Sequence, residues 1–186
     1  MAVALPSRSR FLEFCAAAAL YRQGATFLND VTVGDDGVIY MTDNFANRIY
    51  SFSDGKAELF VEDAALIGPN GILADGDTLV VASFGTLAEK PEDMVPGGLV
   101  SIDIATKTLT PMAGTEATGF LDGIVKMGDR YVVTDFFGGK VLALMPGEIP
   151  EMLDQLAMGS ADIGTDGTDI FVPMMMEGEL IRLSVD

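Results

Sequence analysis

The side chains best able to do chemistry in this sequence are carboxylates and amides, because the common partners of catalytic nucleophiles are missing. Histidine is absent, and Cys15 is the one cysteine. This composition excludes Ser-His-Asp and Cys-His catalysis, histidine-ligated zinc and an internal disulfide. What remains is oxygen chemistry: a carboxylate that acts as a general base, or a hard cation such as calcium bound by carboxylate and amide oxygens.

These oxygen-bearing residues recur within a repeat. Four stretches share one layout, and aligning them on Asn29, Asn70, Asp122 and Ala161 gives spacings of 41, 52 and 39 residues. Each stretch alternates β-branched or aromatic runs with Asp-Gly, Gly-Asp or Gly-Gly turns, which is typical of short strands joined by hairpins. A period of about forty residues with about four strands per unit predicts the blades of a β-propeller. We therefore expect an all-β fold with four blades, at approximately 24–64, 65–116, 117–157 and 158–186.

Two segments depart from the repeat. The long second interval comes from an inserted loop, 84–97, which contains Pro91 and Pro96. Residues 1–23 carry a net charge of +2, whereas the whole chain has a formal net charge of -17. Within this segment, phenylalanines and leucines flank a run of four alanines. This first segment is compatible with a short helix, a frayed tail, a signal peptide weakened by Glu13, or sequence outside the fold.

The direction of the strands predicts where the polar residues gather. Neighbouring strands of a blade are antiparallel, so the start of the first strand and the end of the second lie on one face. First-strand starts carry Asn29, Asp30, Asn70, Asp122 and Asp162, and second-strand ends carry Asp43, Ser83, Asp135 and Met174. We expect the first set to converge on one mouth of the central channel and the second set to form the rim of the pocket. Any one of these residues alone is more simply a turn former, but recurrence at one phase favours a site.

Several of these runs resemble a known family. Residues 27–31 (Phe-Leu-Asn-Asp-Val), 68–71 (Gly-Pro-Asn-Gly) and 121–123 (Leu-Asp-Gly) resemble the gluconolactonase and senescence-marker-protein (regucalcin) family. Residues 159–162 followed by 172–175 are similar to a bacterial branch of it, many of whose members are exported. The resemblance covers about residues 24–186. It implies a six-bladed propeller that binds one divalent metal, commonly calcium, in its central channel and hydrolyses sugar lactones or related esters.

The resemblance also implies roles for individual residues. Asn70 and Asp122 would be metal ligands, and Asp122 would be the catalytic general base that activates water. Asn29, with Asp30, Asp162 and Phe27, would contact the substrate. The expected function is a divalent-metal-dependent lactonase or esterase acting on a small-molecule lactone or ester.

A second hypothesis comes from a different functional class. A propeller can be a non-catalytic scaffold that binds a ligand or a protein on one face, because fold does not imply function. Its binding surface would then be apolar. The candidate residues are Phe27, Phe84, Phe136, Phe137 and the methionines 174–176.

The sequence departs from the family pattern in three ways. It holds four units where the family has six, and the first missing unit carries the family's glutamate ligand, so we expect an N-terminally truncated chain with an incomplete metal site and weak or no activity. Phe27 stands where the sugar-lactone enzymes tend to have an arginine, which argues against sugar acids. The last unit ends after its third strand, and such open edges would allow self-association.

Charge and hydropathy restrict the remaining partners. A surface with 28 acidic and 11 basic residues repels phosphate backbones, so nucleic acid is not expected as a partner. No run reaches the length of about 18 apolar residues needed for a membrane span. The resemblance favours a periplasmic or secreted location for the full-length relative, and a cytoplasmic location stays open for this chain.

Overall fold

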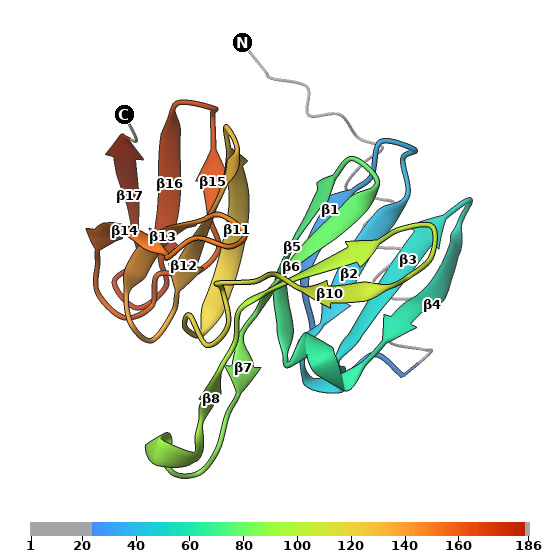
Figure 1. Ribbon diagram of the computed structural model, residues 1–186, viewed down its shortest axis with the longest axis horizontal. Helices are drawn as coiled ribbons and strands as arrows, with labels where there is room; N and C mark the ends of the chain where they lie inside the picture. The colour runs from blue at the N-terminus through green and yellow to red at the C-terminus, as the bar shows by residue number, and fades with distance from the viewer. Residues whose placement is uncertain (1–23, 185–186) are drawn as a thin grey trace.

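A computed structural model describes residues 24–184, which form four small antiparallel sheets in chain order and one separate two-stranded hairpin (Figure 1). The first sheet contains β1 (Leu28–Val33), β2 (Ile39–Asp43), β3 (Arg48–Ser53) and β4 (Lys56–Glu62), and the second contains β5 (Pro69–Asp75), β6 (Thr78–Ser83), β9 (Leu99–Asp103) and β10 (Leu109–Pro111). The third contains β11 (Leu121–Met127), β12 (Arg130–Asp135), β13 (Lys140–Leu144) and β14 (Glu151–Gln155), and the fourth contains β15 (Gly164–Thr165), β16 (Asp169–Met174) and β17 (Glu179–Ser184). The helix or tail predicted for residues 1–23 lies outside the described residues.

The sheets are the blades of a β-propeller, which confirms the predicted all-β fold with four blades. Within each sheet every strand pairs with the next in an antiparallel ladder. The first strands of successive blades lie side by side, because β1 packs against β5, β5 against β11, and β11 against β15. These first strands are therefore the inner strands, and residues at their starts face a shared centre.

Most of the hydrophobic core lies in the spaces between blades. Three clusters of buried side chains lie between the first and second, the second and third, and the third and fourth blades; they include Ile49, Leu66 and Leu79, then Val80, Leu121 and Leu144, then Val132, Ile170 and Val172. A fourth cluster is formed within the first blade by Met41, Tyr50, Phe52 and Ala57. A blade between two neighbours is covered on both faces. This explains why β6 and β12 are continuous apolar runs that are almost completely buried, instead of alternating with polar residues.

The inner strands of the first three blades contain a β-bulge at the same point. The register between first and second strands shifts between Leu28 and Val31, between Pro69 and Ile72, and between Leu121 and Ile124. The two bulged residues are thus 29–30, 70–71 and 122–123. Because a bulge bends the strand and re-aims its side chains, it sets the direction of the polar residues that the sequence alignment placed in phase.

The second bulged position decides how closely two blades approach. A Cβ on Gly71 would lie 2.4 Å from the carbonyl oxygen of Asp122, and one on Gly123 would lie 2.5 Å from the backbone nitrogen of Ile163. Glycine therefore permits the next inner strand to pack directly against the bulge. In the first blade this position is Asp30, whose Oδ2 accepts a 2.8 Å hydrogen bond from the backbone N–H of Ile72 in the next blade.

Two threonines fix consecutive inner strands to each other. The hydroxyl of Thr42 accepts a hydrogen bond from the Asp30 N–H (3.0 Å) and donates one to the Asn70 carbonyl (2.7 Å). In the third blade, the hydroxyl of Thr134 accepts from the Gly123 N–H (3.0 Å) and donates to the Ala161 carbonyl (2.6 Å). Each hydroxyl thus satisfies a bulge amide of its own blade and a carbonyl of the following one.

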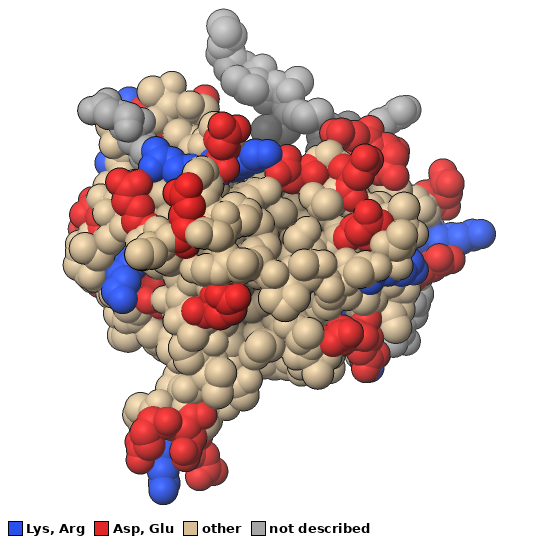
Figure 2. Space-filling view, viewed as in Figure 1, with Lys and Arg blue, Asp and Glu red and all other residues tan. Residues whose placement is uncertain are grey.

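The inserted loop of the second blade forms a projecting hairpin. It contains β7 (Gly85–Thr86), the short 3-10 helix η3 (Pro91–Asp93) and β8 (Val95–Pro96), and it extends away from the blades (Figure 1). Acidic residues and one lysine gather on this projection (Figure 2). Over residues 24–184, none of the helices is long and apolar enough to cross a membrane.

Candidate functional site

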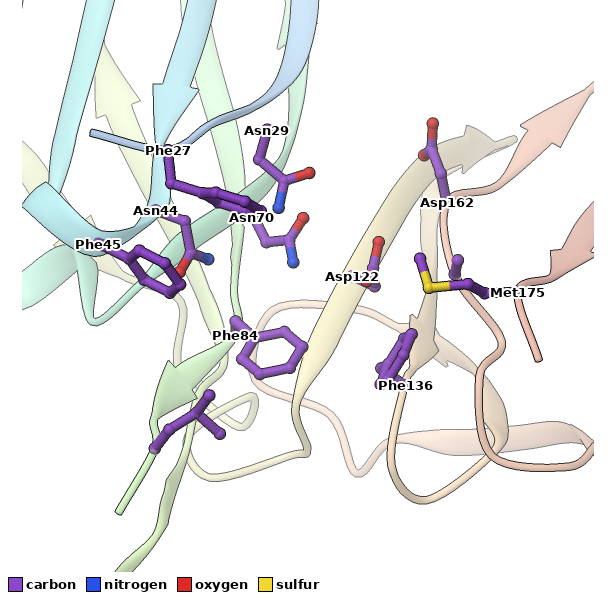
Figure 3. A pocket seen from close by; sticks show the side chains of 12 residues that line it. Phe27, Asn29, Asn44, Phe45, Asn70, Phe84, Asp122, Phe136, Asp162 and Met175 are labelled. Atoms are coloured by element: carbon purple, nitrogen blue, oxygen red, sulfur yellow. The ribbon is translucent and has the colours of Figure 1, made fainter. Parts of the chain in front are cut away.

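One pocket lies where the starts of the inner strands meet, and all four blades contribute to it. Its volume is about 450 Å³. It is lined by Phe27, Asn29, Asn44, Phe45, Asn70, Phe84, Leu87, Asp122, Phe136, Ala161, Asp162 and Met175 (Figure 3). The four residues on which the repeats were aligned, Asn29, Asn70, Asp122 and Ala161, are all among them.

The polar part of the pocket is formed by residues of the three bulges and by Asp162, which precedes β15. Asn29 and Asn70 project from one side, and Asp122 and Asp162 lie across from them (Figure 3). We call these four residues the polar floor. Asp30 was predicted to contact substrate, but its carboxylate is engaged by backbone amides of Ile72 and Val31 and it does not line the pocket. Phe27, the fourth predicted substrate residue, lines the pocket beside the floor.

Burial and neighbouring negative charge raise the pKa of two carboxylates near the floor, Asp122 and Asp30. Burial raises the pKa of Asp122 to about 7, the negative charges of Asp162 and Asp30 add to the effect, and a hydrogen bond with the Asn70 side chain opposes it. Burial also raises the pKa of Asp30 to about 6, with a contribution from Asp162, while hydrogen bonds from Ile72 and Val31 act in the opposite direction. Asp122 can therefore take up a proton near neutral pH, as a general base must.

Two sets of residues, adjacent in sequence, lie at the ends of the second strands, and we call each set a ring. The strand-end ring is Asp43, Ser83, Asp135 and Met174, the set predicted to form the pocket rim; all four are buried and none lines the pocket. The mouth ring is the residue that follows each of them, Asn44, Phe84, Phe136 and Met175, and all four line the pocket. Successive side chains at a strand end point in opposite directions. The last residue of each second strand is therefore buried within the propeller, and the residue after it lines the mouth of the pocket.

The two carboxylates of the strand-end ring, Asp43 and Asp135, accept hydrogen bonds from backbone N–H groups. Asp43 Oδ1 accepts hydrogen bonds from the Thr26 hydroxyl (2.6 Å) and the Phe27 N–H (2.8 Å), and its Oδ2 accepts from the Thr26 N–H (2.9 Å). Asp135 Oδ1 accepts from the N–H groups of Phe120 and Gly138, both at 3.1 Å. These acids fix the segments that lead into β1 and β11, and so they position Asn29 and Asp122 of the floor indirectly.

The remaining two members of the strand-end ring differ from the acids. Met174 packs in the core between the third and fourth blades. Ser83 is 1% exposed, and its Oγ is the buried side-chain oxygen without a hydrogen-bond partner among the residues that the structure describes. The second blade has Ala82 where the first and third have Thr42 and Thr134, so it also lacks the threonine link to the next inner strand.

Apolar side chains surround the polar floor. The rings of Phe27 and Phe45 are stacked with centroids 4.8 Å apart, and Phe84 contacts Phe136 at 6.2 Å. Behind them, Phe120 and Phe137 complete a network of edge-to-face contacts. We call the large apolar lining residues the collar; they are Phe27, Phe45, Phe84, Leu87, Phe136 and Met175.

Sequence reasoning missed several of these residues as parts of the candidate site. Asn44, Phe45 and Leu87 were not predicted, while Phe84, Phe136 and the methionines were considered only as a scaffold's binding surface. Asn44 donates a hydrogen bond from Nδ2 to the Gly68 carbonyl (3.2 Å), which ties the mouth of the first blade to the second. The usable signal was the position directly after each second strand, which recurs in every repeat.

The oxygen atoms of the polar floor are of the type that binds a hard cation. The floor offers only carboxylate and amide oxygens, which calcium and magnesium prefer. Within residues 24–184 there is no group of three or more His, Cys, Asp or Glu side chains that could hold a metal ion. A cation bound by Asp122 would therefore depend on the amide oxygens of Asn70 and Asn29 and on water to approach the six to eight ligands, roughly, of a calcium shell.

No protein-family model matches this chain, and no curated protein sequence does. Solved structures do match it. A virginiamycin B lyase from Staphylococcus aureus, crystallised as a catalytically inactive variant with quinupristin, has a TM-score of 0.63 and 19% identity over 86% of this chain and 52% of its own. A gluconolactonase from Xanthomonas campestris has a TM-score of 0.64 and 14% identity over 84% of this chain and 61% of its own.

A structure of a nidogen/laminin complex also matches, with a TM-score of 0.70 and 14% identity over 88% of this chain and 61% of its own. This chain thus spans between half and about three fifths of the length of these structures. The likeness confirms the propeller fold. The predicted resemblance to gluconolactonases is supported at the level of structure.

Proposed function

We propose that the pocket hydrolyses a small-molecule lactone or related ester, with Asp122 as the general base. The observation that carries the proposal is the convergence of Asn29, Asn70 and Asp122, from three successive bulges, on one pocket. The pocket is large enough for a small molecule. A gluconolactonase is one of the structures of similar fold, and the proposed reaction is taken from it.

The reaction needs few groups. Asp122 takes a proton from a water molecule as the water oxygen attacks the carbonyl carbon of the lactone. The bond between that carbon and the ring oxygen then breaks, and the proton passes from Asp122 to the departing ring oxygen, which leaves a hydroxy acid. The side-chain amides of Asn29 and Asn70 lie where they can hydrogen-bond the substrate's oxygens and orient its carbonyl.

A divalent cation such as calcium, held by Asn70 and Asp122, is part of the proposal. When bound, it would polarise the substrate carbonyl as a Lewis acid. The support is the oxygen chemistry of the floor and the negative charges of Asp162 and Asp30 near Asp122, which add to the effect of burial in raising its pKa. We expect slow turnover, because the described residues provide fewer ligands than a complete calcium shell.

Asp122→Asn tests the proposal, because it keeps the shape of the side chain and removes the base. We expect hydrolysis of lactones above the uncatalysed rate by the unchanged chain in calcium, and a loss of about 100-fold or more in kcat/KM in the variant. Asp129→Asn, at the exposed turn after the same strand, is the matched control and should keep the activity. Chelation of calcium should lower the rate if the cation takes part.

Two results would overturn the proposal. One is no hydrolysis by the unchanged chain at any calcium concentration. The other is equal activity in the Asp122→Asn variant. Ligand binding without turnover would instead favour the non-catalytic propeller.

A further inference from the structure

The collar is the part of the pocket that the proposed chemistry does not use. Hydrolysis needs the polar floor, yet every blade also places at least one apolar side chain at the mouth: Phe27 and Phe45 from the first, Phe84 and Leu87 from the second, Phe136 from the third and Met175 from the fourth. Leu87 comes from the projecting hairpin, so an insertion outside the repeat adds to the same apolar surface.

Several collar side chains are open to water. Phe45 is 69% exposed, Met175 is 63% exposed and Leu87 is 51% exposed. Exposed apolar side chains grouped around a pocket are a surface that gains free energy when an apolar ligand covers them. Stacking of Phe27 on Phe45 and the contact of Phe84 with Phe136 hold the rings in place, so a ligand would meet an ordered surface.

The distribution of polar groups argues against a polyhydroxylated ligand. A sugar lactone carries a hydroxyl on most of its carbons, and each needs a hydrogen-bond partner when it leaves water. The collar offers phenyl, isobutyl and thioether groups, and one N–H of the Asn44 amide is already bonded to the Gly68 carbonyl. Apart from Asn44, the polar side chains of the lining lie on the floor, where they suit one compact polar group.

We infer that the ligand of this pocket is amphipathic: a lactone or ester whose polar ring or carbonyl sits on the floor and whose alkyl or aryl substituent lies along the collar. The inference rests on the proposed function for the lactone or ester group, and on the collar for the substituent. Phe45, Leu87 and Met175 are then the residues that determine specificity, because they are the most exposed members of the collar.

A series of γ-lactones with lengthening alkyl chains, from γ-butyrolactone to γ-dodecalactone, tests the inference. We expect kcat/KM to rise about two- to fourfold per added methylene, the upper figure corresponding to full burial of each methylene. Glucono-1,5-lactone should be a poorer substrate than γ-dodecalactone. A flat response to chain length, or a preference for the gluconolactone, would overturn the inference.

Variants of the collar locate the effect. Phe45→Ala and Leu87→Ala should reduce the gain per methylene to less than about twofold, so that kcat/KM falls more for γ-dodecalactone than for γ-butyrolactone. Both side chains are largely exposed, so these variants should fold. Ile149→Ala, an exposed apolar residue away from the pocket, is the control and should keep the full gradient. Collar variants that keep the gradient would contradict the inference.

Binding separates this inference from the proposed function. Calorimetric titration of the Asp122→Asn protein with γ-butyrolactone and γ-dodecalactone measures affinity without turnover. Tighter binding of the longer lactone, with no hydrolysis by the unchanged chain, would uphold the amphipathic ligand and refute the enzyme. Hydrolysis that is insensitive to chain length, with equal binding of both lactones, would uphold the enzyme and refute the amphipathic ligand.

Discussion

The strand-end ring and the mouth ring are neighbours in sequence and differ in almost every property. Asp43, Ser83, Asp135 and Met174 are buried, and the acids among them hold backbone N–H groups. The next residues, Asn44, Phe84, Phe136 and Met175, line the pocket. The strand-end ring therefore stabilises the fold, and the mouth ring is placed to contact a ligand in the pocket.

The comparison shows how a propeller separates folding from binding. Residues that satisfy buried backbone groups cannot change without a cost in stability. One position later, Phe84, Phe136 and Met175 have apolar side chains and Asn44 makes a single bond to the Gly68 carbonyl, so the same fold can carry different side chains there at a smaller cost. In this chain the mouth ring contains one amide, two phenyl rings and one thioether, which makes the mouth apolar around a polar floor.

The largest expected effect on stability comes from Asp43→Ala. The change leaves the N–H groups of Thr26 and Phe27 without their acceptor, so we expect the free energy of unfolding to fall by about 2–4 kcal/mol. Asn44→Ala, one residue later, loses only the bond to Gly68 and should cost about 1 kcal/mol. Urea denaturation measures the free energy of unfolding of both variants. Equal losses would contradict the claim that the strand-end ring stabilises the fold more than the mouth ring does.

A second prediction concerns the pH dependence of stability, which comes from the carboxylates near the floor. The folded protein holds Asp122 with a pKa of about 7 and Asp30 with a pKa of about 6, against an ordinary value of 3.8 for each. Between pH 4 and 7 the folded state therefore binds more protons than the unfolded state, and the free energy of unfolding falls as the pH rises.

Urea titrations in calcium-free buffer at pH 4.5 and 7.5 measure this dependence. The Asp122→Asn protein lacks one of the two titrating groups, so its stability should fall less between these pH values. The acids whose pKa is lowered, such as Asp75 and Asp169, titrate below this window and do not obscure the result. The same slope in both proteins would show that Asp122 does not titrate differently on folding.

The smallest effect is expected for Ser83→Ala. Of the strand-end ring, Ser83 has a hydroxyl that is buried with no hydrogen-bond partner in the described part of the chain, residues 24–184. Removing it loses no bond and relieves the cost of burying a polar atom, so the free energy of unfolding should change by less than about 1 kcal/mol, in the stabilising direction. A loss comparable to that of Asp43→Ala would reveal a partner for this hydroxyl.

Much of the fold could be predicted from local patterns. Turn dipeptides and β-branched runs repeat with a period of about forty residues, and the antiparallel pairing of strands in a blade fixes which ends share a face. Those two facts were enough to predict four blades and to bring Asn29, Asn70, Asp122 and Asp162 to one pocket, as the structure does.

The sequence did not reveal which side of a strand end faces the pocket. Alternation assigns successive side chains to opposite sides, but it does not say which of Asp135 and Phe136 turns inward, because both follow the same apolar run. The hydrogen bonds of Asp135 to Phe120 and Gly138 decide this, and they join segments that are distant in the chain or turn back on it.

The amino-acid sequence by itself determined the repeat, the strand-rich fold and the phase at which polar residues recur, because these depend on local propensity and spacing. The tertiary structure decided the bulges that re-aim Asn29, Asn70 and Asp122, the burial and mutual repulsion that raise the pKa of Asp122, and the collar that surrounds it. These features arise from contacts between blades. Their physical cause is the close packing of one inner strand against the next, which no single repeat contains.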